Sequence, residues 1–381
     1  MAAASAAVAA VPAPASAADL PAPGKRTGGA AKRLVLPAPT GRHHLGTVAL
    51  HLADRSRPDP WVPAERVREL MVQLWYPAPD ARRLPLAPWV SPAFAALVNP
   101  PGSGYELPLT HARLGAPALP GRRPVVLYSP GFGVERTAST AVAEELASHG
   151  YIVVTIDHTH DSPLVEFPDG RVARSAVPPP TGEPGEEDRL IAKALAARVA
   201  DTRFVLDWLA RPQRALPSGL WYAMDQRAIG MIGHSLGGTT AAETMLEDGR
   251  VKAGCNLDGA MSGRVMTEGL DRPFLLVGSE GHGRAGDETW AAFWAVLRGP
   301  RLELQLRDSG HMSFTDYQVL LPQAGIPAED LVEPLGTIDG DRSVRVQRAY
   351  LLAWADRRLS GRRGTLLDGP CAAFPEMRFL P

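Results

Sequence analysis

The chain has 381 residues, of which 45% are hydrophobic, so it can bury one large core or two modest ones. Lys and Arg number 40 against 41 Asp and Glu, which gives a formal net charge of -1. This balance gives no indication of a nucleic-acid surface, which would need a basic excess on one face. No run of 18 uncharged apolar residues follows Asp19, so no membrane span is predicted there.

The N-terminal segment differs in composition from the rest and consists mainly of Ala, Pro, Ser and Val. Ala15-Ser16-Ala17 resembles the small-residue cleavage site of a signal peptide, although no Lys or Arg precedes Lys25. We expect residues 1–35 to form a disordered Ala/Pro-rich tail or a signal-peptide remnant. Residues 36–381 are expected to form a single domain. We expect a secreted protein, with a cytoplasmic location as the alternative.

The remaining sequence alternates strand patterns with helix patterns. Runs 47–52 and 70–76 alternate apolar with polar residues and predict antiparallel edge strands. Short apolar runs predict buried strands at 124–128, 151–156, 228–232, 251–257, 273–277 and 302–306. Amphipathic runs predict helices at 137–149, 188–209, 239–246, 288–297 and 344–359, and residues 159–187 predict a long surface loop. This order predicts an α/β fold, with a mainly parallel central sheet and helices on both faces.

A serine stands at the apex of the most informative motif, Gly233-His-Ser-Leu-Gly-Gly238. The motif lies between a predicted strand and a predicted helix, as in the nucleophile elbow of the α/β-hydrolase fold. Gly233 and Gly237 remove side chains that would clash at such a sharp turn. The pattern predicts Ser235 as a nucleophile at a helix N-terminus, where backbone N–H groups can stabilise an oxyanion.

A nucleophilic serine needs a base, and the base needs an orienting acid. Only His282 and His311 follow Ser235, and His311 comes directly after the strand predicted at 302–306, so we expect His311 to be the base. Asp258 and Glu280 follow successive predicted strands, and either could reach the imidazole because strand ends converge on one crevice. Position alone leaves the acid open, although the commoner arrangement of the fold would favour Glu280.

The oxyanion hole requires a second N–H from the turn after an earlier central strand. Tyr128-Ser-Pro-Gly-Phe-Gly133 fits that turn. We expect the backbone N–H groups of Phe132 and Leu236 to hold the oxyanion.

Four motifs in order carry a resemblance to the platelet-activating-factor acetylhydrolase family, which includes plasma, type II intracellular and bacterial enzymes. They are Ser129-Pro-Gly-Phe-Gly133, Gly233-His-Ser-Leu-Gly-Gly238, Asn256-Leu-Asp-Gly-Ala-Met261 and Ser309-Gly-His-Met-Ser-Phe-Thr-Asp316. The resemblance implies Asp258 as the acid and His311 as the base, with Glu280 in reserve. It also implies cleavage of short or oxidised acyl chains at the second position of phospholipids, without calcium. We expect the reaction to require no metal or organic cofactor.

Other functions remain open from the sequence. A general lipase or polyester hydrolase of the same fold is the nearest alternative, and a non-catalytic binding protein is a remote one. Asp157-His-Thr-His-Asp161 invites a metallo-hydrolase interpretation, but the fuller ligand pattern is absent. The expected partner is a small-molecule or lipid ester, with transient contact with a lipid surface and no nucleic acid. Cys255 and Cys371 could pair if the protein is exported, or stay separate thiols; the sequence leaves the oligomeric state open.

Overall fold

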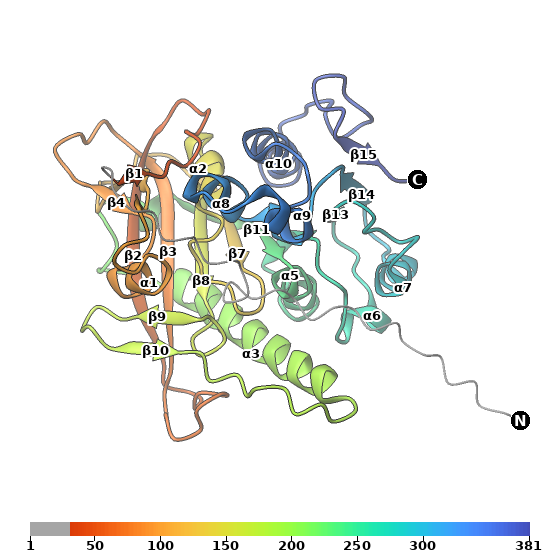
Figure 1. The fold of residues 1–381 in the computed structure, drawn as a ribbon, viewed down its shortest axis with the longest axis horizontal. Helices are drawn as coiled ribbons and strands as arrows, with labels where there is room; N and C mark the ends of the chain where they lie inside the picture. The colour runs from red at the N-terminus through yellow and green to blue at the C-terminus, as the bar shows by residue number, and fades with distance from the viewer. Residues whose placement is uncertain (1–30) are drawn as a thin grey trace, which may run out of the picture.

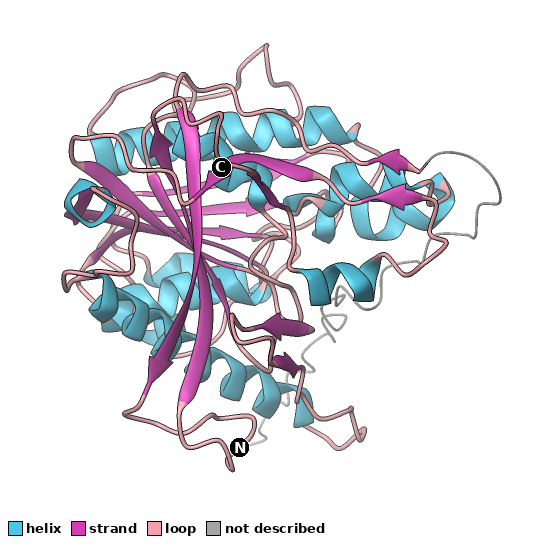
Figure 2. Cartoon of the chain, turned by 90° about the vertical axis from the view of Figure 1, so that its left-hand side faces the viewer, coloured by secondary structure: helices cyan, strands magenta, loops and turns pink. Residues whose placement is uncertain are grey.

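A large twisted sheet with helices on both sides organises the molecule (Figures 1 and 2). The computed structural model describes residues 31–381, so most of the predicted tail and its candidate cleavage site lie outside the described residues. Within that range the main sheet has eleven strands in the order β15-β14-β13-β12-β11-β7-β8-β3-β2-β6-β4. Two small two-stranded sheets, β1-β5 and β9-β10, accompany it.

The strands are β1 Lys32–Arg33, β2 His44–Asp54, β3 Arg68–Ala78, β4 Leu86–Pro88, β5 Tyr105–Glu106, β6 Leu109–Leu114, β7 Arg123–Ser129, β8 Ile152–Asp157, β9 Leu164–Glu166, β10 Val172–Arg174, β11 Met224–His234, β12 Val251–Leu257, β13 Phe274–Gly278, β14 Arg301–Leu306 and β15 Met377–Phe379. The α-helices are α1 Pro92–Val98, α2 Thr140–Ser148, α3 Glu186–Leu209, α4 Leu220–Ala223, α5 Leu236–Glu247, α6 Val265–Glu268, α7 Glu288–Val296, α8 Tyr317–Ala324, α9 Ala328–Leu335 and α10 Gly340–Ala355. A 3-10 turn, η2 His311–Phe314, and a π-turn, η3 Asp356–Ser360, complete them.

Six neighbouring strands, from β8 through β7, β11, β12 and β13 to β14, run parallel and form the centre of the sheet. Their side chains alternate between two apolar layers. Val125 and Leu127 pack with residues of α3, α5 and α7, whereas Val126 and Tyr128 pack with residues of α2 and α10. A strand buried on both faces needs apolar residues throughout, which explains the short uninterrupted apolar runs of the sequence. The predicted α/β architecture is confirmed.

The two early strands pair with each other in antiparallel fashion, as predicted, but they do not lie at the sheet edge. β3 pairs with β8 on one side and β2 on the other, and β6 and β4 extend the sheet beyond β2. The edge prediction was wrong because β6 and β4, which were not predicted as strands, pair beyond β2; β4 has only three residues.

The segment predicted as a surface loop at 159–187 is only partly exposed. Residues 158–162 and most of β9 are buried, and the β9-β10 hairpin lies within the segment. Buried polar residues in this segment bond to side chains from distant parts of the chain, which a local pattern does not reveal. At the N-terminal side, β1 and the buried Leu34 lie within the last residues of the predicted tail.

Candidate active site

Ser235 lies on a strained turn between β11 and α5. Its backbone angles are φ 54° and ψ -128°, and a positive φ is rare for a residue with a side chain. Two positions of the turn, 233 and 237, have no room for a side chain. A Cβ on Gly233 would lie 1.9 Å from the carbonyl oxygen of Gly237, and one on Gly237 would lie 2.0 Å from that of Ser129. The glycines of the motif are therefore required by backbone packing around the serine.

The turns that follow β7, β11 and β12 share one edge of the sheet. Ser129 pairs with Gly233 and His234 pairs with Leu257, so these three parallel strands end at the same level. The N–H of Ser235 donates to the carbonyl of Leu257 at 2.8 Å. The candidate nucleophile is thereby fixed beside the residue that precedes Asp258.

The structure brings Asp258 and His311 together. Asp258 follows β12, and its Oδ2 accepts a hydrogen bond from Nδ1 of His311 at 2.7 Å. Burial would raise the pKa of Asp258, but hydrogen bonds from His282 and His311 hold it well below its usual range. The carboxylate therefore stays ionised, as an acid that orients a catalytic imidazole must.

Glu280 occupies a different environment. Its Oε2 accepts the N–H of Asp308 at 2.9 Å, and its Oε1 forms an exposed ion pair with Arg378 at 3.0 Å. The acid that the commoner arrangement of the fold would favour is thus engaged at the surface. Asp258 is the acid hydrogen-bonded to His311.

His234, next to the serine, was not singled out from the sequence. Its Nε2–H donates to the carbonyl oxygen of His311 at 2.9 Å, and the two rings lie 4.6 Å apart between centroids. Burial, together with the nearby His311 ring, lowers the pKa of His234 to about 3, so the ring is neutral at physiological pH. His234 thus connects the nucleophile turn to the histidine turn through an uncharged contact.

Within residues 31–381, no hydrogen bond joins the Ser235 hydroxyl to the His311 ring in this structure. Hydrogen bonds between nucleophile and base are often loose in enzymes without substrate and tighten in the substrate complex. Proton transfer from Ser235 to His311 requires that contact to close.

The turn predicted to carry the oxyanion hole touches the nucleophile. A Cβ on Gly131 would lie 3.3 Å from the Cβ of Ser235. The N–H of Leu236 belongs to the first residue of α5, where the helix provides no acceptor for it. Phe132 packs in an apolar cluster that also contains Leu236 and Trp61. The two residues predicted to supply the N–H groups thus directly follow Gly131 and Ser235 in the chain and share one apolar cluster.

A buried arginine stabilises this turn through hydrogen bonds to its backbone. The guanidinium of Arg198, on α3, donates to the carbonyl oxygens of Pro130 and Gly131, the latter at 2.8 Å. It also pairs with Asp161 at 2.6 Å, and Asp161 accepts the N–H of Gly133 at 3.2 Å. The rigid fork of an arginine suits this task because it can satisfy several acceptors at once.

The chain matches the sequence model of the family described as platelet-activating factor acetylhydrolase, isoform II, over residues 105–171 and 218–362. These segments make up more than half of the chain. The chain belongs to this family. The matched segments contain Ser235, Asp258 and His311, so the family assignment and the site geometry concern the same part of the molecule.

Relatives of known name agree with this assignment. A probable 1-alkyl-2-acetylglycerophosphocholine esterase from Arthroderma benhamiae is 28% identical over 383 residues, which cover 91% of this chain and 94% of the relative. The platelet-activating factor acetylhydrolase of Cavia porcellus is 27% identical over 278 residues, 65% of this chain and 63% of the relative. The solved structure of a ferulic acid esterase from Streptomyces cinnamoneus superposes with a TM-score of 0.81 and 40% identity, covering 91% of this chain and 99% of that one. This member of the acetylhydrolase family is a serine ester hydrolase with the α/β-hydrolase fold.

The segment that invited a metal interpretation belongs mostly to buried ionic contacts. His158 joins Asp201 at 2.9 Å and Ser129 at 2.9 Å, and all three side chains are fully buried, so this second Ser-His-Asp arrangement is closed to substrate. Asp157 pairs with Arg136. The remaining ionisable residues of the segment are Asp161, described above, and His160.

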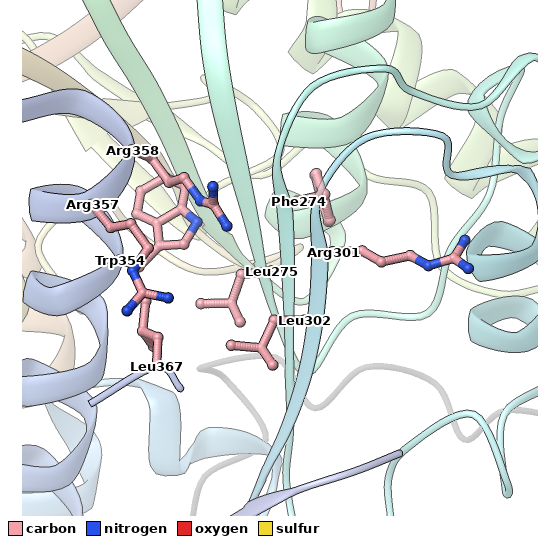
Figure 3. A pocket seen from close by; sticks show the side chains of 8 residues that line it. All are labelled: Phe274, Leu275, Arg301, Leu302, Trp354, Arg357, Arg358 and Leu367. Atoms are coloured by element: carbon pink, nitrogen blue, oxygen red, sulfur yellow. The ribbon is translucent and has the colours of Figure 1, made fainter. Parts of the chain in front are cut away.

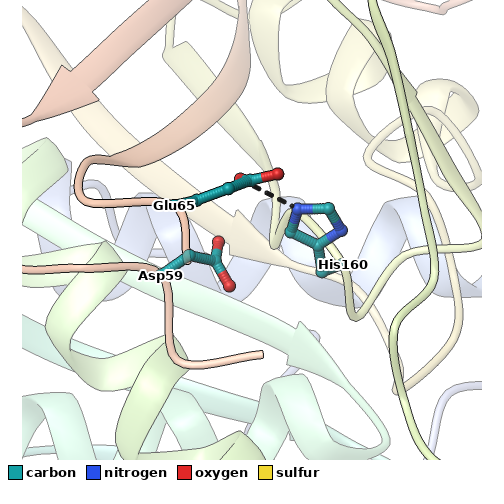
Figure 4. Close-up of side chains that lie close together, drawn as sticks. All are labelled: Asp59, Glu65 and His160. Carbon is teal, nitrogen blue, oxygen red and sulfur yellow. Dashed lines mark hydrogen bonds and ion pairs between the residues drawn. The ribbon is translucent and has the colours of Figure 1, made fainter. Parts of the chain in front are cut away.

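His160 contributes to a group of three possible metal-binding side chains with Asp59 and Glu65, shown in Figure 4. Their ligand atoms lie within 4.8 Å of one another, and His160 already bonds to Glu65 at 3.2 Å. Asp59 pairs with the buried Arg68 at 2.6 Å. A guanidinium on the same carboxylate opposes a divalent cation there, so the donor set does not favour a metal.

Figure 3 shows the side chains that line a cavity of about 170 Å³. It is lined by residues at the start of β13 and β14, such as Leu275 and Leu302, and by Trp354, Arg357 and Arg358. Because Ser235 and Asp258 lie at the opposite, carboxyl ends of the parallel strands, the cavity is not part of the candidate active site.

Both Cys255 and Cys371 are free thiols. No helix in residues 31–381 is long and apolar enough to span a membrane.

Proposed function

We propose that Ser235, His311 and Asp258 form the catalytic triad of this ester hydrolase, and that it cleaves short-acyl esters through an acyl-enzyme. The hydrogen bond of 2.7 Å between His311 and Asp258 is the observation that carries this proposal. It fixes the proton on Nδ1 of His311, which leaves Nε2 free to accept the proton of Ser235. Ser235 itself lies on a strained backbone at the start of α5, the place of the serine in a nucleophile elbow, and is 5% exposed.

The proposed reaction has two halves. In the first, Ser235 Oγ attacks the ester carbonyl while His311 takes its proton, and the N–H groups of Phe132 and Leu236 stabilise the oxyanion. His311 then gives the proton to the leaving alcohol, and the serine is acylated. In the second half a water molecule, activated by His311, attacks the acyl-enzyme, and the carboxylic acid leaves. The chemistry uses these groups of the chain and water.

The family and the apolar packing beside the oxyanion turn support the substrate class. Phe132 is partly buried against a cluster that contains Trp61, Leu195, Val199 and Leu236, and apolar surroundings suit an acyl group better than a charged one. We propose a short-acyl phospholipid as the substrate, reached through transient contact with a lipid surface. The likeness to a ferulic acid esterase, at 40% identity, favours an aromatic acyl ester as the second candidate.

Turnover of matched esters tests the two candidates. We would compare kcat/KM for a short-acyl phospholipid, methyl ferulate and p-nitrophenyl esters of increasing chain length. The proposal predicts that the short-acyl phospholipid is turned over well and that activity on p-nitrophenyl esters falls as the acyl chain lengthens. Preference for methyl ferulate over the phospholipid would select the second candidate, and good turnover of long chains would favour a general lipase.

We further propose that the protein is exported, on the basis of the Ala15-Ser16-Ala17 segment, which lies outside the described residues. N-terminal sequencing of the protein recovered from culture medium would show cleavage after Ala17. Intact protein retained in the cytoplasm would favour the alternative.

A further inference from the structure

His282 lies between two carboxylates, one of which belongs to the candidate triad. Its Nδ1 hydrogen bonds to Oδ1 of Asp258 at 2.7 Å, and its Nε2 hydrogen bonds to Oδ2 of Asp287 at 2.9 Å. An imidazole can donate from both nitrogens only when it is protonated. The ring also lies on Trp290, with 4.4 Å between ring centroids. The geometry is therefore that of an imidazolium held between two carboxylates, and the arrangement Asp258–His282–Asp287 is here named the clamp.

The clamp occupies the oxygen of Asp258 that His311 does not use. Oδ1 of Asp258 accepts from His282 and from the N–H of Ser279 at 2.6 Å, while Oδ2 accepts from His311 at 2.7 Å. Three donors on two oxygens leave the carboxylate little freedom to rotate. The orientation of His311 thus depends on His282 and on the N–H of Ser279 as well as on Asp258.

We propose that His282 is a positioning residue, which as a cation between Asp258 and Asp287 holds the acid toward His311 and sets the pH range of ester hydrolysis. This inference rests on the triad proposed above. His282 does not act as a second base, because both of its nitrogens are already bonded to carboxylates.

The charges around His282 support a lasting cation. Burial lowers its pKa, but the hydrogen bonds and negative charges of Asp258 and Asp287 outweigh burial and raise the pKa to about 9. His311 faces it across the carboxylate of Asp258. The other charged groups beside its loop are paired among themselves, Arg284 with the buried Glu303 and Glu280 with Arg378. The ring is therefore positive throughout the neutral range.

A positive charge beside Asp258 offsets part of the negative charge that stabilises protonated His311. Removing it should make His311 hold its proton more strongly, so that the acidic limb of the pH profile moves upward by about one unit. Above pH 9 the wild-type clamp should release, since a neutral ring can no longer donate to both acids.

Variants at His282 distinguish the effect of its positive charge from the effect of its hydrogen bond to Asp258. His282→Asn keeps a donor where Nδ1 stands but removes the charge, whereas His282→Ala removes both. Asp287→Asn weakens the clamp from the other side and keeps a good helix cap, because Asp287 accepts the N–H groups of Thr289 and Trp290 at the start of α7. The matched controls are His111→Asn, which alters a His-Glu144 pair elsewhere, and Asp339→Asn, which alters the cap of α10.

The experiment measures kcat and KM for p-nitrophenyl acetate from pH 5 to 10, with thermal unfolding of every variant. We expect His282→Asn to shift the acidic limb upward by about one unit with a modest loss of kcat. His282→Ala should shift it likewise and lose about tenfold or more in kcat at unchanged KM, and Asp287→Asn should shift it less. Both controls should overlay the wild type.

Profiles for both His282 variants that overlay the wild type, in folded protein, would overturn the inference. If the His282 variants do not fold, two other observations test the inference: the upward shift of the acidic limb in Asp287→Asn and an alkaline limb of the wild-type profile near pH 9. Absence of both would overturn the inference. Labelling of Ser235 by a fluorophosphonate, run in parallel, shows whether the inference about His282 or the proposed triad is wrong. Labelled Ser235 with unmoved profiles refutes only the role of His282.

Discussion

Replacing Asp258 by asparagine tests how the acid works. Asp258 accepts hydrogen bonds from His282, from the N–H of Ser279 and from His311 on its two oxygens. Asparagine has one carbonyl oxygen and one NH₂ group. The NH₂ group must therefore replace one of the two accepting oxygens and face a group that donated to it. If the NH₂ group faces His311, Nδ1 of that ring must accept, and the proton moves to Nε2. The ring then cannot take the proton of Ser235.

The loss should be large. The wrong tautomer of a triad histidine costs about 10⁴ in kcat, which corresponds to about 5.4 kcal/mol of transition-state stabilisation. KM should change little, because Asp258 does not touch the substrate. Thermal unfolding must accompany the kinetics, since breaking a buried ion pair costs about 3–5 kcal/mol of stability. Turnover of p-nitrophenyl acetate by folded variant at neutral pH gives the comparison.

Glu280→Gln is the matched control. Glu280 is 41% exposed in its pair with Arg378, and surface pairs of this kind contribute about 0–1 kcal/mol to stability. We expect its kcat to stay within about twofold of the wild type, since no charge buried in the site is lost. Near-normal turnover by Asp258→Asn, together with collapse of Glu280→Gln, would refute the reasoning and make Glu280 the acid.

Three further predictions concern packing, the oxyanion turn and pH. Gly238→Ala should lower the melting temperature by several degrees, or prevent folding, because the new Cβ would lie 1.8 Å from Oδ1 of Asn256. Arg198→Lys should lower kcat by about tenfold or more at similar KM, because an ammonium group cannot reproduce the fork that holds the turn; turnover of p-nitrophenyl acetate measures it. Burial raises the pKa of Glu135 to about 7, so native protein binds more protons than unfolded protein between about pH 4.5 and 7, and stability falls as pH rises there. Glu135→Gln should flatten that fall, as followed by urea unfolding across this pH range.

Each of these predictions has an outcome that contradicts it. An unchanged melting temperature for Gly238→Ala would show that the elbow can relax. Wild-type kcat for Arg198→Lys would show that the oxyanion turn keeps its conformation without the guanidinium. An identical pH dependence of unfolding in Glu135→Gln and wild type would place the responsible group elsewhere.

Local sequence patterns predicted the central strands and the nucleophile turn because their causes are local. The apolar runs of β7, β8 and β11 reflect burial on both faces, and the positive φ of Ser235 belongs to the turn itself. Gly233 avoids a clash within the turn, whereas Gly237 and Gly238 leave room for Ser129 and Asn256 from other parts of the chain. α8 and α9 were missed for a related reason. Each contains a proline, Pro322 and Pro334 respectively, and proline usually ends a helical pattern.

The choice between Asp258 and Glu280 could not be made from position, since both follow parallel strands that end at the same edge. Side-chain partners distinguish them, and only the family resemblance pointed to Asp258 beforehand. Arg198 gave no signal because its acceptors lie 67 and 68 residues earlier in the chain. His282 was considered only as a rival base, and its link to Asp287 is visible once both loops are folded.

Covalent trapping of Ser235 tests the central claim most directly. Folded wild-type protein should react with a fluorophosphonate, and mass spectrometry should place the adduct on Ser235. The Ser235→Ala variant should neither react nor hydrolyse p-nitrophenyl acetate. An adduct on another residue, or ester hydrolysis retained by Ser235→Ala, would contradict the proposed mechanism.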